Sequence, residues 1–122
     1  MKYILKQDSV TKTIKIRVSG IINTKVAEEM VLATGAELNR TGFQKCLINF
    51  TRTELDPNQT MTEMFIFVEV FKKAEIKKSV KMAALILTED EHRLHLEKAA
   101  NLEGYKLKHF TTRNKALLWL CM

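Results

Sequence analysis

The sequence is poor in cysteine, glycine and proline, the residues that are abundant in disulfide-rich proteins and in flexible linkers. Its 122 residues include only two cysteines, four glycines and one proline. Two cysteines do not make the disulfide framework of a small secreted protein, and so few glycines and prolines leave no room for a flexible linker. We therefore expect a single domain over residues 1–122, reduced and cytoplasmic.

Long apolar runs are also missing. The longest, Ala116–Met122, falls far short of the ~20 residues that span a bilayer, and the first six residues hold no stretch suited to a signal peptide. No transmembrane segment is predicted. What the chain does have is 46% hydrophobic and 28% charged residues, close to the average of soluble globular domains, so a buried core is expected.

The formal net charge of +6 is spread along the chain without a basic or acidic tail. Some of the basic residues lie among apolar residues in the predicted strands: Lys2, Lys6, Lys15, Arg17, Lys106 and Lys108. If all helices lie on one side of the sheet, these side chains share an open, positive face, although lysine on an edge strand also serves simply to block aggregation. No aromatic residues interleave with them and no recognition motif occurs, so nucleic acid is not an expected partner.

The apolar pattern predicts an opening β-hairpin followed by alternating helices and strands. Residues 13–19 alternate strictly between apolar and polar side chains, which indicates a half-buried strand, and residues 2–7 form a shorter strand before them. A helix follows, capped by Asn23 or Thr24 and ended by Gly42. Residues 46–50 and 82–87 are apolar on both sides, which is typical of central parallel strands.

Three more helices and one more strand complete the order. Pro57 begins a helix over 57–74, a capping box at 88–91 begins one over 89–103, and Thr112 caps the last, over 113–120. Residues 105–110 alternate as a strand. The sequence therefore predicts an α/β fold: an opening β-hairpin, whose second strand begins the first of four β/α units, in a mostly parallel five-stranded sheet with helices mainly on one face.

The helix predicted over 57–74 is apolar around more than half of its circumference, beyond the stripe that one sheet face requires. The residues concerned include Met61, Met64, Phe65, Val68 and Phe71. Such a surface could line a pocket for an apolar, lipid-like ligand, form a homodimer contact, or be buried deeply in the core. The pattern alone leaves all three interpretations open.

Candidate catalytic and metal-binding residues are few. His92 and His95 lie three residues apart on a predicted helix, a spacing that suits two metal ligands, but no third ligand accompanies them. Cys46 lies within an apolar strand, where a thiol is usually a small core residue, and no nucleophile elbow or glycine-rich phosphate loop occurs. We expect no enzyme activity, no metal and no cofactor, and structural roles for both histidines.

The segment 51–60 follows a central strand at its carboxyl end, where open α/β sheets bind ligands and partners. It offers Thr51, Arg52, Asn58 and Thr60 beside the N-terminus of the next helix. A hydrogen-bonded turn that only caps the helix is the alternative. These four residues form the candidate partner-binding site.

With this order of elements the chain resembles the SpoIIAA-like family, in which STAS domains and related CRAL-TRIO-like bacterial proteins are grouped. Residues 18–22, followed by a capped helix, resemble the family's first strand-to-helix step, and Cys46–Thr51 is similar to the apolar strand before its Asp-containing segment. Phe110 with residues 115–120 is similar to the family's ending. The resemblance implies a non-catalytic module that binds a protein partner or itself, with a lipid-like ligand as the alternative.

One feature of the family is missing from this chain. Anti-sigma-factor antagonists carry an Asp-Ser-Ser-Gly type segment at the start of the second helix, and its serine is phosphorylated. Here residues 56–60 contain no serine, and Thr60 and Thr62 lie outside the family's motif. The resemblance therefore does not extend to the phosphorylation switch.

Overall fold

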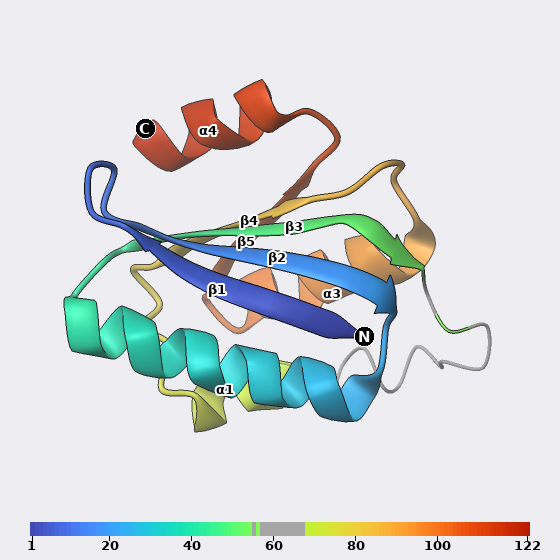
Figure 1. The fold of residues 1–122 in the computed structure, drawn as a ribbon, viewed down its shortest axis with the longest axis horizontal. Helices are drawn as coiled ribbons and strands as arrows, with labels where there is room; N and C mark the ends of the chain where they lie inside the picture. The colour runs from blue at the N-terminus through green and yellow to red at the C-terminus, as the bar shows by residue number, and fades with distance from the viewer. Residues whose placement is uncertain (55, 57–67) are drawn as a thin grey trace.

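A computed structural model gives the fold and describes residues 1–54, 56 and 68–122 (Figure 1). Its elements are, in order, β1 (Lys2–Asp8), β2 (Thr13–Ile21), α1 (Thr24–Thr41), β3 (Lys45–Glu54), β4 (Lys81–Leu85), α3 (Glu91–Leu102), β5 (Lys106–Phe110) and α4 (Arg113–Cys121). Residues 68–73 are also helical. None of the helices in these described ranges is long and apolar enough to cross a membrane.

The five strands form one sheet in the order β1-β2-β3-β4-β5. β1 and β2 are antiparallel, and their turn is held by Asp8, whose Oδ1 accepts bonds from the backbone N–H groups of Val10 and Thr11. β2, β3, β4 and β5 run parallel to one another. The predicted hairpin, the mostly parallel sheet and the inner position of the two apolar strands are confirmed, although β3 continues to Glu54 and β4 ends at Leu85.

The helix ends follow from local hydrogen bonding. Asn23 caps α1, because its Oδ1 accepts from the backbone N–H groups of Lys25 and Val26. Gly42 ends α1 in the left-handed conformation, at φ 73°. The predicted capping box at 88–91 is wrong: α3 begins at Glu91, and Asp90 is its cap. Asp90 takes this role because its carboxylate accepts from the backbone N–H of Arg93, at 2.9 Å.

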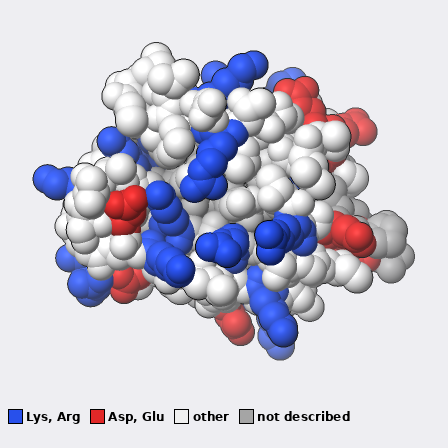
Figure 2. Space-filling model, turned by 45° about the horizontal axis from the view of Figure 1, so that its top comes forward, with Lys and Arg blue, Asp and Glu red and all other residues white. Residues whose placement is uncertain are grey.

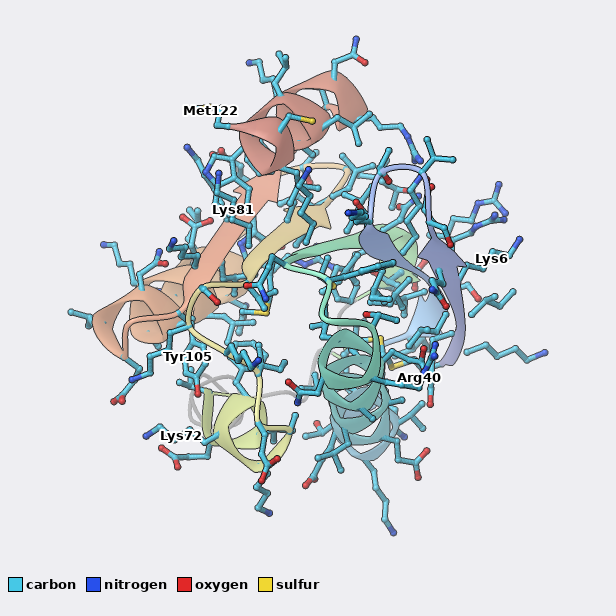
Figure 3. All side chains as sticks on the ribbon, turned by 90° about the vertical axis from the view of Figure 1, so that its left-hand side faces the viewer. Lys6, Arg40, Lys72, Lys81, Tyr105 and Met122 are labelled. Carbon is cyan, nitrogen blue, oxygen red and sulfur yellow. The ribbon has the colours of Figure 1, made fainter. Side chains whose placement is uncertain are left out.

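Helices cover the two faces of the sheet unequally (Figure 3). α1, the helix of residues 68–73 and α3 lie on one face, and α4 lies over the other. Ile14, Ile16 and Val18 of β2 belong to the main core on the first face. A smaller cluster beneath α4 consists of Leu47, Ala83, Ala116 and Leu120.

Lys81 of β4 anchors the end of α4 to the sheet (Figure 3). Its ammonium group donates to the carbonyl oxygens of Trp119, at 3.0 Å, and Met122, at 2.6 Å. The same Nζ lies 5.4 Å from the centroid of the Trp119 ring. A cation at a helix C-terminus is favourable because it meets carbonyls that have no partner within the helix. This contact fixes which part of the face α4 covers.

The described part of the apolar helix is buried in the main core. Val68 and Phe71 are 3% and 6% exposed, and Phe71 packs edge-on against Tyr105 with ring centroids 5.5 Å apart. The apolar cavity beside Phe71 measures about 80 Å³, well below the roughly 300 Å³ at which ligand pockets begin. These two residues therefore have a core role and give no support to a lipid-like ligand or a homodimer contact. Met61, Met64 and Phe65 lie outside the described residues.

Candidate binding site at the carboxyl end of β3

The end of β3 is shaped by an irregularity in its pairing with β2. Arg17 of β2 pairs with Asn49, but Ser19 pairs with Arg52, so β3 carries one extra residue between these two pairs. Asn49 Oδ1 accepts from the backbone N–H of Thr51, at 2.9 Å, and from its hydroxyl, at 2.6 Å. The bulge is thus held by side chains, with Thr51 half-buried and Arg52 exposed.

Arg93 of α3 fixes the same strand end from the side. Its Nη1 donates to Asp90 Oδ2 at 2.9 Å, and its Nη2 donates to Thr53 Oγ1 at 3.1 Å. The guanidinium carbon lies 5.7 Å from the centroid of the Phe50 ring. The Arg93 side chain is only 13% exposed, so these contacts are shielded from water and hold the start of α3 to β3.

A second polar contact lies between α3 and β5. Glu97 Oε1 accepts from the backbone N–H of His109 at 2.6 Å and lies 3.3 Å from the ring Nδ1. The His109 side chain is 4% exposed. Its burial lowers the pKa of the imidazole below the ordinary value of 6.5, against the opposing effect of the Glu97 carboxylate. The ring is therefore neutral at pH 7, with Nδ1–H directed at Glu97.

This burial predicts that the protein loses stability in mild acid. The unfolded chain takes up a proton at His109 more readily than the folded chain does. The free energy of unfolding of the protein therefore falls as the pH drops through 6.5. We expect this loss to begin as the pH falls below about 6.5, where the unfolded chain starts to bind the proton that the buried ring resists. Urea unfolding above and below this pH measures it.

The matched variants for this prediction are His109→Gln and His92→Gln. His109→Gln should flatten the dependence on pH, because no imidazole is left at the buried position. His92→Gln removes an imidazole outside the contact with Glu97 and should keep the wild-type profile. Equal profiles for wild type and His109→Gln would show that the buried ring does not control the acid response.

The other residues considered for chemistry have structural surroundings. Cys46 is fully buried within β3, and burial raises the pKa of its thiol to about 12, so it is protonated at neutral pH. His92 and His95 are half-buried on α3, and His95 Nδ1 lies 2.8 Å from the carbonyl oxygen of Glu91.

The structure places two of the four predicted partner-binding residues. Thr51 and Arg52 lie together at the end of β3, beside the contact of Arg93 with Thr53. Asn58 and Thr60 lie outside the described residues. Arg93 was not predicted for this site: its spacing of three residues from Asp90 indicates an ion pair within α3 but not a contact with Thr53. Together these side chains present hydrogen-bond donors and one exposed cation on a fixed strand end.

Comparison with solved structures identifies the fold. The structure of an anti-sigma factor antagonist from Mycobacterium paratuberculosis is 16% identical with a TM-score of 0.63, over 99% of this chain and 94% of that one. The anti-sigma factor antagonist SpoIIAA in its unphosphorylated form is 13% identical with a TM-score of 0.54, over 98% of both chains. The Bacillus cell fate determinant SpoIIAA in the phosphorylated form is 13% identical with a TM-score of 0.53, over 98% of this chain and 99% of that one.

These likenesses confirm the SpoIIAA-like fold, of the STAS type, that the sequence predicted. No protein-family model matches the sequence, and no curated protein matches it. At these identities the likeness concerns the fold, so the function has to be argued from the site.

Proposed function

We propose that this chain, with its SpoIIAA-like fold, is a non-catalytic regulatory module that binds a protein partner. The similar structures are named as antagonists of an anti-sigma factor, which supports a protein as the partner class. The observation that carries the proposal is the fixed end of β3. It presents the exposed Arg52 next to the partly buried contact between Arg93 and Thr53.

The partner-binding surface in this proposal consists of Thr51 and Arg52 together with Asn58 and Thr60. A surface held in one conformation before binding loses less conformational entropy on association. The bulge bonds of Asn49 and the contact of Arg93 with Thr53 supply that rigidity. An exposed guanidinium at such a place suits a hydrogen-bonded contact with a partner's carboxylate or carbonyl groups.

The proposal is tested by affinity purification of the tagged chain from the cells that produce it. Variants Arg52→Ala, Asn58→Ala and Thr60→Ala should each recover about ten-fold less partner than wild type if each removes a contact of about 1.4 kcal/mol. Circular dichroism should show that all the variants fold as the wild type does. The control Lys106→Ala, in the edge strand β5, should recover as much partner as the wild type. Equal recovery by all four variants would contradict the proposed surface.

A further inference from the structure

α4 covers only part of its face of the sheet. Its apolar residues Ala116 and Leu120 pack on Leu47 of β3 and Ala83 of β4. Among the described helices, none other lies on this face, so β1, β2 and the end of β3 are left uncovered there (Figure 1). Strand alternation places Lys6, Lys15 and Arg17 on this uncovered part, because Lys15 pairs with both Lys6 and Leu47.

Cations from four elements converge on a hollow beside α4. Lys6 of β1, Arg17 of β2, Arg52 of β3 and Arg113 of α4 all line it, and its volume is about 320 Å³. Lys15 also lines it but is paired with Asp8, at 2.9 Å. Within the described residues, the other four cations have no ion pair. Figure 2 shows Lys and Arg side chains gathered on this side of the molecule.

A second hollow continues the first along β1. It measures about 490 Å³, adds Lys2 to the lining, and shares Ile4, Arg17 and Arg52 with the first hollow. Ile4 is an apolar side chain left 57% exposed between the cations. We call the two hollows together the basic trough, which is formed by Lys2, Ile4, Lys6, Arg17, Arg52 and Arg113.

The positive charges that line the basic trough repel one another. Lys6 and Lys15 are direct partners across β1 and β2, an arrangement that destabilises a sheet when both charges are alike. Arg17 and Arg52 lie diagonally across β2 and β3, and both line each of the two hollows, so both face the space where a carboxylate would bind. Asp8 neutralises the charge of Lys15 only. A bound acidic group would neutralise the remaining positive charges of the trough.

The shape of the basic trough distinguishes among anionic partners. The first hollow lies between α4 and the sheet, so the trough cannot follow the flat surface of a bilayer, and its continuation along β1 can hold an extended chain. Glu54 ends β3 two residues after Arg52, and its carboxylate would repel a phosphate backbone that continued past the trough. Ile4 would suit an apolar side chain between acidic ones. These features favour a short acidic peptide segment over a nucleic acid.

We propose that the basic trough binds an acidic segment of the protein partner in an extended conformation. The inference rests on the proposed function and adds the chemistry of the partner. In the proposed complex, carboxylates of the segment bind Arg17 and Arg52 at the centre of the trough. Another carboxylate binds Arg113 or Lys6 at the side near α4, and an apolar residue contacts Ile4.

The test is selection of binding peptides from a displayed random library on the full chain, followed by fluorescence anisotropy of a selected peptide. The selected sequences should be enriched in Asp and Glu. Arg17→Glu and Arg113→Glu should each weaken binding about ten-fold or more, because each reverses a charge that faces a carboxylate. Lys106→Glu makes the same change in net charge on the far side of α4 and should stay within about two-fold of wild type. Lysine in place of the peptide's acidic residues should restore binding to Arg17→Glu.

Three outcomes would overturn the inference. The first is a selected set without acidic enrichment, and the second is equal weakening by Lys106→Glu and Arg17→Glu. The third is a labelled single-stranded oligonucleotide that binds more tightly than any peptide and loses binding in Arg17→Glu, which would assign the trough to nucleic acid. If one of these occurs while Asn58→Ala and Thr60→Ala still reduce recovery of the partner, the proposed function stands and only the partner's chemistry is wrong.

Discussion

Gly35→Val is expected to destabilise the protein by about 3 kcal/mol, at the upper end of the usual range for overpacking a core. Gly35 lies in α1 where this helix meets Ala74, just after the helix of residues 68–73. A Cβ atom at Gly35 would lie 2.7 Å from the Ala74 Cβ and would also contact the Ala74 carbonyl oxygen. The chain would have to shift its backbone to accept the side chain, because the obstacle includes main-chain atoms.

Urea unfolding followed by circular dichroism measures this loss. Ala36→Val is the matched control, since it adds a similar side chain to the next residue of α1 on the exposed side. Its cost should be about 0.6 kcal/mol, the difference in helix propensity alone. Similar midpoints for the two variants would mean that α1 does not pack against Ala74 in the way described.

Arg93→Ala is expected to cost about 2 kcal/mol and to loosen the end of β3. The change removes the hydrogen bonds of the guanidinium to Asp90 and Thr53, and it leaves a quarter-exposed carboxylate at Asp90 without that partner. Since Arg93 joins α3 to β3, backbone amide hydrogens of residues 51–54 should exchange faster in the variant than in the wild type. Urea unfolding and hydrogen exchange measure the two effects.

Arg40→Ala is the matched control for Arg93→Ala. Arg40 also pairs with an acidic residue three positions earlier on its helix, Glu37, at 2.7 Å, but its side chain is 61% exposed. Its removal should cost at most about 0.5 kcal/mol, as for other exposed ion pairs. Equal costs for the two variants, or unchanged exchange at 51–54 in Arg93→Ala, would remove the role given to Arg93 in fixing the strand.

The fold follows from the sequence where local signals agree. Alternation in β2, burial on both sides of β3 and β4, and the caps at Asn23 and Gly42 all indicate the same elements that the structure contains. The start of α3 was misplaced because residues 88–91 fit the capping pattern, while Asp90 is the residue whose carboxylate meets a free N–H. Patterns of residue type do not decide between neighbouring caps of similar strength.

The candidate site was only partly predictable. Position at the carboxyl end of a central strand was enough to single out Thr51 and Arg52. Arg93 meets Thr53 across 40 residues of sequence, so no local pattern could join them. The basic trough depends on how far α4 extends over the sheet, which is set by its packing on Leu47 and Ala83 and by the Lys81 contact. The residue types of the strands alone do not show that Arg17 lines the trough and Lys106 does not.

Site-specific photocrosslinking tests whether the end of β3 meets a protein partner. A photoreactive amino acid is placed at position 52 in one sample and at position 106 in another, and the chain is irradiated in the cells that produce it. We expect a discrete protein adduct of one mass from position 52, at several-fold higher yield than from position 106. The same adducts at the same yield from both positions, or none from position 52, would contradict this expectation.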